Sequence, residues 1–344
     1  MDILELKQKI NQILNLINEE KLTNLIAEAI LVFDKLDKSK QYHLAFSGGK
    51  DSHVLLAIYL LYKKIFKVNN FDCIILFSDT RLETDDLYQL IVKIEKFLKD
   101  KEIIERVYPE NNYWYYQFVY GYPVPTNFNR WCTNELKVKP MKKSKKIAIT
   151  GRHLGESKNR DETLKKENCS SGECGIDKVK QSIDPLLHFR DCDIWDLLFY
   201  TDNSILYNGV LNTLKQTYNG KENKRGSLRM GCFMCPVVGI STIAKNNDIE
   251  GLEIRKTLEK LRKARRINSQ KTKNLGAIYI EDRRVIWNEL NKEILLRRGF
   301  ISEQEIKEID ELLKTECYPK TYKKEWISSE HKRLLKQPNQ LSLF

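Results

Sequence analysis

The chain has 344 residues, of which 41% are hydrophobic and 10% aromatic, and this composition predicts a folded core of one large domain or two smaller ones. Its formal net charge of +12 is compatible with a polyanionic partner such as nucleic acid. No apolar run is long enough to span a bilayer and the start lacks a signal-peptide pattern, so we expect a cytoplasmic protein with no membrane partner.

The predicted elements alternate along the chain. Helical spacing of leucines and isoleucines predicts two helices within residues 2–37. Nearly continuous apolar runs predict strands buried on both faces, at 42–46, 73–78 and 147–150. Helical patterns at 52–66 and 84–100 separate these strands. The alternation predicts an α/β fold with a doubly wound parallel sheet, in which ligands bind beyond the carboxyl ends of the strands.

A glycine loop follows the first predicted strand. Residues 47–52 read Ser-Gly-Gly-Lys-Asp-Ser and lead into a helical pattern. Glycines let backbone N–H groups approach an anion, and a helix N-terminus adds partial positive charge. The string differs from a Walker A loop, which has four residues between its first glycine and Gly-Lys-Ser/Thr. We predict that this loop binds phosphate groups through Ser47, Gly48, Gly49, Lys50, Asp51 and Ser52.

Two further candidates lie at strand ends. Asp79 closes the second predicted strand, where an acid could hold Mg²⁺ on ATP phosphates, bind a ribose hydroxyl or cap a helix. Gly151 and Arg152 follow a later strand. Arg152 and Arg160 carry guanidinium groups suited to bidentate phosphate binding. A turn at Asp184 and a helix near 193–198 are interpreted as structural.

The eight cysteines are better suited to metal ligation or sulfur chemistry than to a disulfide framework. Arg130 and nearby lysines are expected to lower the pKa of Cys132 and favour its thiolate. Cys232 and Cys235 form a Cys-x-x-Cys pair, which can ligate one metal or one cluster. The same pair could also be a redox pair or half of a zinc site.

Together these segments resemble the PP-loop ATP pyrophosphatase superfamily, and over about 42–240 its phosphoadenosine phosphosulfate reductase-like branch. The motifs that carry the resemblance are 47–52, 79–83, 130–140, 151–160 and 231–236. The sequence is most similar to the ATP pyrophosphatase of bacterial DNA phosphorothioation systems of the Dnd and Ssp types. The resemblance implies a Rossmann-like core that cleaves ATP to AMP and pyrophosphate. It also implies ATP-binding roles for residues 47–52, Asp79, Gly151 and Arg152. Catalytic roles are implied for Lys50, Asp51, Arg152, Arg160 and Cys132.

The resemblance further implies a 4Fe–4S cluster. Cys132 matches the second cysteine of the family's Cys-Cys pair, where Trp131 replaces the first, and Cys232 and Cys235 match its later pair. Cys169, Cys174 and Cys192 could supply the missing ligand, and Cys174 is the first choice. A rival ligand set is Cys169, Cys174, Cys232 and Cys235, and zinc on four cysteines is the alternative to iron.

The family also includes reductases, which carry a C-terminal Glu-Cys-Gly-(Leu/Ile)-His motif. This chain has only Glu-Cys-Gly-Ile-Asp at 173–177, which counts against sulfite production. We therefore expect an enzyme that adenylates a DNA backbone phosphate for sulfur insertion, with a cysteine desulfurase as sulfur donor. The alternatives are a sulfonucleotide reductase, a tRNA thiolation enzyme and a DNA-binding module that only senses nucleotide.

The predicted organisation has four parts. A helical segment at 1–40 precedes the PP-loop domain with its cysteines at 41–245, a basic and mainly helical region at 246–330, and a tail at 331–344. Lysines and arginines between 255 and 273 could follow a phosphate backbone or simply form a solvated helix face. Residues Gln340–Phe344 resemble the bacterial sliding-clamp binding peptide, and the alternative is a tail that packs on its own domain.

Overall fold

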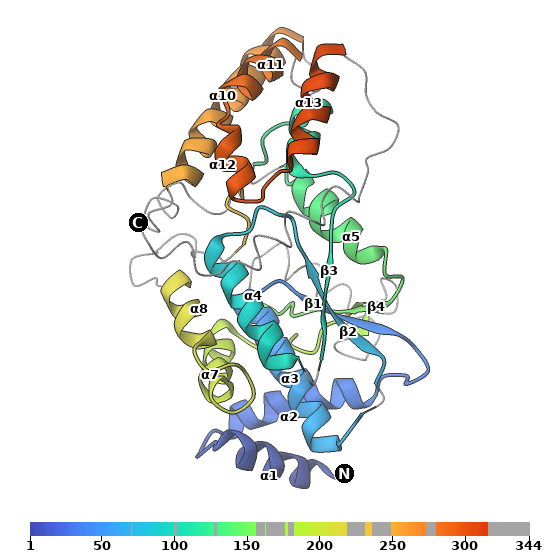
Figure 1. Cartoon of the computed structure of the whole chain (residues 1–344). Helices are drawn as coiled ribbons and strands as arrows, with labels where there is room; N and C mark the ends of the chain where they lie inside the picture. Colours follow the sequence, from blue (N-terminus) through green and yellow to red (C-terminus); the bar gives the residue numbers. More distant parts are fainter. Residues whose placement is uncertain are drawn as a thin grey trace. The chain divides into compact units, whose positions relative to one another are not determined.

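The computed structural model describes residues 1–69, 71–99, 102–126, 129–155, 162, 176–177, 182–218, 231–235, 249–272 and 280–315. The chain forms two compact units, which are described separately (Figure 1). The first comprises Met1–Phe77, Leu90–Val107 and Met141–Asn219. The second comprises Ser78–Gln89, Tyr108–Pro140 and Gly220–Phe344. The four-part division predicted from the sequence stays a prediction.

The first unit is built around a sheet with the strand order β3-β2-β1-β4-β6-β5. The strands are β1 (Tyr42–Phe46), β2 (Cys73–Ser78), β3 (Ile104–Val107), β4 (Ile147–Ile149), β5 (Ile176–Asp177) and β6 (Ser182–Ile183). β1 pairs in parallel with β2 and β4, and β4 pairs in parallel with β6, whereas β5 is antiparallel to β6. The predicted doubly wound parallel sheet is confirmed, and its strand order reverses between β1 and β4.

Helices cover this sheet and extend from it. They are α1 (Ile3–Leu14), α2 (Glu20–Asp34), α3 (Lys50–Phe66), α4 (Asp85–Leu98), α7 (Asp191–Asp202) and α8 (Val210–Tyr218). The side chain of Asp2 caps α1 by accepting the Glu5 N–H at 2.8 Å. α3 contacts β1, α2 and α7 and is buried along most of its length, as its continuous apolar sequence predicts. The two predicted N-terminal helices are confirmed.

The second unit has an aromatic core. Its elements are the π-helical turns η1 (Tyr115–Val119) and η2 (Thr133–Val138) and the helices α10 (Ile249–Thr272), α11 (Ile280–Glu289), α12 (Lys292–Arg297) and α13 (Glu303–Thr315). The short helix α5 (Lys139–Lys142) begins in this unit and ends in the first. Phe118 packs on Trp287 with ring centroids 4.9 Å apart, and Phe233 stacks on Phe300 at 4.6 Å. The described part of the chain contains no helix long and apolar enough to cross a membrane.

A buried ion pair fixes the segment after β2 in the second unit. Arg81 has a φ of +63°, and its Nη1 lies 2.7 Å from Glu305 Oε1 on α13. The two side chains are 2% and 0% exposed. Glu305 also accepts the Ser302 N–H at 2.7 Å. Charges this deep depend on one another, since neither is solvated by water.

We expect Glu305→Gln to lower the free energy of unfolding by about 3–5 kcal/mol, because it leaves the Arg81 charge buried without its partner. Urea unfolding followed by circular dichroism measures the change. Glu303→Gln, at an exposed position of the same helix, is the control and should shift stability by less than about 0.5 kcal/mol. Equal stability of the two variants would contradict the role given to the ion pair.

Candidate functional site

The loop at 47–52 joins β1 to α3 and is shaped by its own hydrogen bonds. The Gly49 N–H donates to Ser47 Oγ at 3.4 Å, and Ser52 Oγ donates to Gly49 O at 2.8 Å. Gly48 has a φ of +74°, in the left-handed region that favours glycine. Gly49 is the N-cap of α3. The first N–H groups of a helix have no acceptor within it, so this end of α3 is suited to bind an anion.

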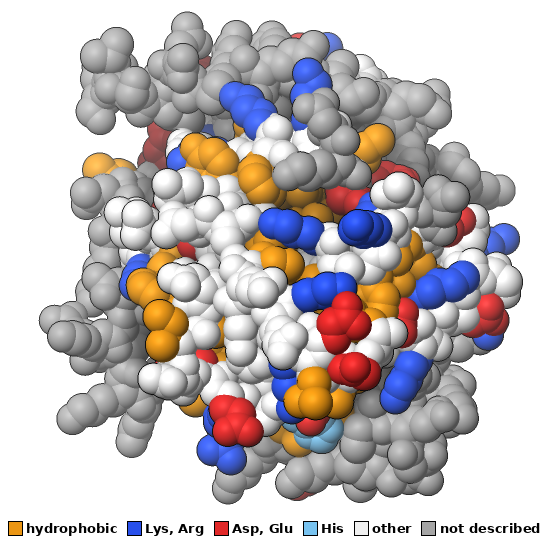
Figure 2. All heavy atoms as spheres, turned by 90° about the horizontal axis from the view of Figure 1, so that it is seen from below, with side chains coloured by type: hydrophobic (Ala, Val, Ile, Leu, Met, Phe, Trp, Pro, Cys, Tyr) orange, Lys and Arg blue, Asp and Glu red, His pale blue; other side chains and the backbone are white. Residues whose placement is uncertain are grey.

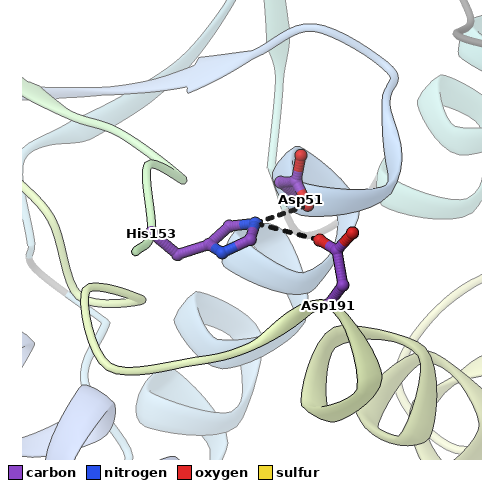
Figure 3. Close-up of side chains that lie close together, drawn as sticks. All are labelled: Asp51, His153 and Asp191. Carbon is purple, nitrogen blue, oxygen red and sulfur yellow. Dashed lines mark ion pairs between the residues drawn. The ribbon is translucent and has the colours of Figure 1, made fainter. Parts of the chain in front are cut away.

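Four charged or titratable side chains gather at the start of α3. Lys50 Nζ lies 2.6 Å from Asp51 Oδ1 and 2.9 Å from Asp191 Oδ1 at the start of α7. His153, from the segment after β4, places its Nε2 3.3 Å from Asp51 Oδ1 and 3.6 Å from Asp191 Oδ1. Figure 3 shows the imidazole pointing toward both carboxylates. The sequence analysis named Lys50 and Asp51 but missed His153 and Asp191.

The pKa values in this group follow from its mixture of charges. Burial alone would lower the pKa of Lys50, but Asp51 and Asp191 raise it above its usual value. Burial alone would raise the pKa of Asp51, but His153 and Lys50 lower it. Burial would also lower the pKa of His153, and the Asp51 carboxylate outweighs this and raises it. Each carboxylate of this group therefore lies next to two basic side chains.

Gly151 permits the close approach of two loops within the first unit. A Cβ at this position would lie 2.9 Å from the backbone oxygen of Asp51, a distance that a real Cβ does not adopt. The loop after β4 can therefore lie against the start of α3 only with glycine here. Gly151 was predicted as an ATP-binding residue, and the structure gives it this packing role next to the loop.

Arg152 is held by an acid at the end of the neighbouring strand. Its Nε lies 3.0 Å and its Nη2 2.6 Å from the two carboxylate oxygens of Asp184, which is completely buried. Nη2 also donates to Ser182 Oγ at 2.9 Å. The ion pair ties the ends of β4 and β6 together. The predicted phosphate-binding role of Arg152 stays a prediction, whereas the structural interpretation of the Asp184 turn agrees with this contact.

Asp79 belongs to the second unit and is completely buried. Its Oδ1 accepts the Arg81 N–H at 2.9 Å and the Tyr88 hydroxyl at 2.7 Å. Glu83, five residues after Ser78, is also buried, and its Oε1 lies 3.2 Å from Lys137 Nζ. The acids of this segment thus shape the turn after β2, and a role of Asp79 toward Mg²⁺ or ribose stays a prediction.

The Cys-x-x-Cys pair is joined to that same turn. Cys232 forms an antiparallel bridge with Glu83, and the Phe233 N–H donates to Leu82 O at 2.9 Å. The Cys235 N–H donates to Cys232 O at 2.9 Å, which closes a tight turn. Gly231 has a φ of +143°, so glycine is favoured where the segment enters this bridge. The cysteine pair therefore has a fixed backbone in the second unit.

The expected activation of Cys132 is wrong in this structure. Burial raises the pKa of Cys132, and so does the neighbouring Cys235. Arg130 and Lys137 act in the opposite direction but do not reverse the shift. Burial also raises the pKa of Cys232, with Glu83 adding to the effect. Thiolates at these positions would need a metal cation to stabilise them.

The described residues bring three of the four predicted cluster ligands into one unit, namely Cys132, Cys232 and Cys235. Cys174, Cys169, Arg160 and the tail Gln340–Phe344 lie outside the described residues. Within the described ranges, the three potential ligand atoms that lie mutually within 4.8 Å belong to Asp51, His153 and Asp191, and the cysteines form no such group.

The basic residues of α10 have mixed roles. Arg255 Nη1 donates to Phe233 O at 3.3 Å, and Arg262 Nη1 lies 2.7 Å from Glu259. Lys260 pairs with Glu289 at 2.5 Å. Figure 2, which views the molecule from below relative to Figure 1, shows a different face, on which lysine and arginine side chains are scattered among acidic and apolar ones. Part of the charge of this helix is thus used within the second unit.

The comparison with protein families identifies the class to which this fold and loop belong. Residues 41–238 match the phosphoadenosine phosphosulfate reductase domain, which is more than half of the chain. The chain therefore belongs to the phosphoadenosine phosphosulfate reductase domain family. This confirms the resemblance to that branch, and the closer resemblance to phosphorothioation proteins stays a prediction.

Two curated relatives come from Methanocaldococcus jannaschii, and both are described as uncharacterized proteins. One is 31% identical over 63% of this chain and 47% of its own length. The other is 28% identical over 60% of this chain and 38% of its own length. The chain thus matches less than half the length of each of these relatives.

Two solved structures are similar to parts of the chain. One is phosphoadenylyl-sulfate reductase from Candida auris in a phosphate complex, with 16% identity, a TM-score of 0.34 and coverage of 57% of this chain and 92% of that one. The other is Candida glabrata FMN adenylyltransferase with FMN and an ATP analogue, with 16% identity, a TM-score of 0.37 and coverage of 58% and 66%. Neither score is high enough to support an inference about this chain.

His53 lies directly behind the loop and gives the site a measurable pH dependence. Its ring is completely buried, and its Nδ1–H donates to Gly49 O at 3.0 Å. Burial lowers the pKa of His53 to about 4 from an ordinary value of 6.5. The unfolded chain therefore binds more protons between these two pH values, so the contribution of neutral His53 is complete above pH 6.5.

We expect this contribution, about 3 kcal/mol, to be lost as the pH falls from 6.5 to 4. His53→Gln should therefore lose less stability than the wild type over this range, as measured by urea unfolding at a series of pH values. His188→Gln, at an exposed position, should keep the wild-type dependence. Parallel curves for wild type and His53→Gln would show that His53 does not titrate in this way.

Proposed function

We propose that this protein is an ATP pyrophosphatase that adenylates a DNA backbone phosphate for sulfur insertion. The observation that carries the first half of the proposal is the arrangement at the start of α3. There a glycine loop, Lys50 and Asp51 follow β1 at the point where the strand order reverses, and the loop after β4 lies against them. Ligands bind at this point in doubly wound sheets, and helix N-termini favour phosphate.

The proposed reaction has three steps. An oxygen of the DNA phosphate attacks the α-phosphorus of ATP, and the bond to pyrophosphate breaks. The terminal sulfur of a cysteine persulfide, formed by a cysteine desulfurase, then attacks the activated DNA phosphorus and AMP leaves. A thiol finally cleaves the sulfur–sulfur bond, so that one sulfur remains on phosphorus and the donor leaves as a disulfide. Adenylation is needed because an unmodified phosphate oxygen is a poor leaving group.

The chain's contribution to the first step is alignment and charge stabilisation. The N–H groups at Gly49 and the start of α3 would bind the outer phosphates. Lys50, which is now paired with two carboxylates, would stabilise the charge on the departing pyrophosphate. Asp51 would hold the Mg²⁺ that accompanies ATP. Arg152 and Arg160 remain candidates for contacts with further phosphate oxygens.

The DNA half of the proposal rests on other features. The net charge of +12 favours a polyanion, and residues 340–344 resemble a sliding-clamp peptide that would tether the protein to replicating DNA. An oxygen of a DNA phosphate can also accept the adenylyl group of ATP. Release of sulfite from a sulfonucleotide, or sulfur found in tRNA instead of DNA, would favour the reductase or the tRNA enzyme.

Cysteine thiolates are suitable ligands for a metal ion or an iron–sulfur cluster, and the second unit contains several cysteines. Cys132, Cys232 and Cys235 would supply three thiolates to a 4Fe–4S cluster, and Cys174 would supply the fourth. The raised pKa values of Cys132 and Cys232 agree with thiols that need a cation to become thiolates. A bound cluster would supply redox chemistry or order this part of the unit, whereas zinc would supply order alone.

Lys50→Ala should reduce the release of pyrophosphate from ATP by at least about 100-fold, because it removes a cation from the departing charge. A coupled pyrophosphate assay with purified protein and duplex DNA measures the rate. Lys64→Ala, at an exposed position of the same helix α3, is the matched control and should keep the wild-type rate. Equal rates for the two variants would remove Lys50 from the mechanism.

The DNA product is tested separately. Cells that express the protein with its genomic neighbours should contain phosphorothioate dinucleotides, which mass spectrometry of nuclease-digested DNA detects. These products should disappear with Lys50→Ala and persist with Lys64→Ala. If ATP is cleaved in vitro but wild-type DNA contains no sulfur, the nucleotide half of the proposal stands and DNA is the wrong acceptor.

Cys232→Ser should abolish the broad visible absorption of anaerobically purified protein, since it removes a cluster ligand. Cys73→Ser, in β2 of the first unit and outside both proposed ligand sets, should leave that absorption unchanged. Absorption spectra with iron and zinc analysis provide the measurement. A colourless wild type that contains zinc would overturn the cluster and favour the zinc alternative.

A further inference from the structure

One ring nitrogen of His153, Nε2, is buried in the first unit without a hydrogen-bond partner. The residue is completely buried. The other ring nitrogen, Nδ1, lies 2.9 Å from Leu154 O, so it must carry the proton and donate it to that carbonyl. In the neutral ring the lone pair is then on Nε2. A backbone carbonyl bound to one nitrogen is the usual support for a histidine that ligates metal through the other.

The direction of Nε2 adds a second argument. It points at Asp51 Oδ1 and Asp191 Oδ1, at 3.3 and 3.6 Å, and the three ligand atoms lie mutually within 4.8 Å (Figure 3). When the imidazole is neutral, its lone pair faces two carboxylates and is repelled unless a positive charge, either a proton on Nε2 or a bound cation, lies among them. The sequence gives no hint of this arrangement, because the three residues come from α3, the loop after β4 and the start of α7.

In this structure the positive charge comes from Lys50. Its Nζ lies 2.6 Å from Asp51 Oδ1 and 2.9 Å from Asp191 Oδ1, between the carboxylates that face His153. The same ammonium is the group proposed to bind the outer phosphates of the nucleotide. If Lys50 moves to a phosphate while the imidazole is neutral, the two carboxylates are left without a cation. That situation is costly for charges that are partly removed from water.

We propose that Asp51, His153 and Asp191 form a binding site for one divalent metal ion, and that Lys50 occupies the position of that ion until a phosphate attracts it away. The move of Lys50 rests on the proposed function, whereas binding of the metal itself does not. One imidazole nitrogen with two carboxylate oxygens favours a first-row ion such as Mn²⁺ over Ca²⁺, which prefers oxygen ligands alone.

The number of protein ligands is typical of a catalytic metal ion, which also binds the substrate. Three protein ligands leave coordination positions open, as in catalytic metal sites, and phosphate oxygens of the nucleotide can fill them. Asp191 is 67% exposed at its side chain, so the site is reachable from solvent. The site differs from the one expected at Asp79, whose Oδ1 already accepts two hydrogen bonds.

Titration of the full chain with Mn²⁺ alone, followed by the electron paramagnetic resonance signal of free Mn²⁺, tests the site. Lys50→Met removes the competing ammonium and keeps the side-chain length, so it should bind one Mn²⁺ at least about tenfold tighter than the wild type. Adding Asp191→Asn to this variant should reverse that gain. Adding Asp196→Asn, at an exposed position of the same helix α7, should not.

Pulsed electron paramagnetic resonance identifies the histidine. Mn²⁺ bound to Lys50→Met should show coupling to a directly bound nitrogen, and His153→Gln should abolish it while thermal melting confirms that the variant is folded. The result that overturns the site is equal Mn²⁺ affinity for wild type and Lys50→Met, or bound Mn²⁺ without nitrogen coupling in folded Lys50→Met.

A non-cleavable ATP analogue tests the exchange. Addition of α,β-methylene-ATP should raise the Mn²⁺ affinity of the wild type toward that of Lys50→Met. An unchanged wild-type affinity would overturn the movement of Lys50. Nitrogen-coupled Mn²⁺ in a protein that does not cleave ATP would refute the proposed function alone, and ATP cleavage without nitrogen-coupled Mn²⁺ would refute the metal site alone.

Discussion

The contact on which the site depends is the approach of the backbone at Gly151 to the backbone at Asp51. A Cβ at 151 would lie 2.9 Å from Asp51 O, so any other residue would force the two loops apart. These loops leave adjacent parallel strands, β1 and β4, on either side of the point where the strand order reverses. Their closeness brings His153 within 3.3 Å of Asp51 and turns an anion-binding helix end into a cluster of opposite charges.

In the proposed exchange, that cluster would give the loop two states of charge. In the structure described here, Lys50 neutralises Asp51 and Asp191, and His153 faces the same two carboxylates. A phosphate that binds at the start of α3 competes for the ammonium, and a metal ion competes for the carboxylates. The same few side chains can thereby respond to nucleotide and metal together. The proposed coupling rests on short distances within one unit.

In the second unit, two contacts hold together segments that are far apart in the sequence. The bridge between Glu83 and Cys232 joins the turn after β2 to the cysteine pair, although 149 positions separate them in the sequence. The pair of Arg81 and Glu305 fixes the same turn to α13. Asp79, which the motif suggested for ligand binding, accepts hydrogen bonds from the Arg81 N–H and the Tyr88 hydroxyl at this turn. The pKa of Cys132 is raised because burial outweighs the nearby cations that the sequence displays.

The sequence by itself determined the alternation of strands and helices, since apolar runs at 42–46 and 73–78 and the helical pattern after 52 are local signals of burial. It also predicted a phosphate loop, because glycines between a strand and a helix N-terminus allow backbone N–H groups to approach an anion. Only the tertiary structure decided that His153 and Asp191 join Lys50 and Asp51, and that Arg152 pairs with Asp184. The physical reason is that pairing depends on which strand ends become neighbours, and strand order is a long-range property that no local pattern contains.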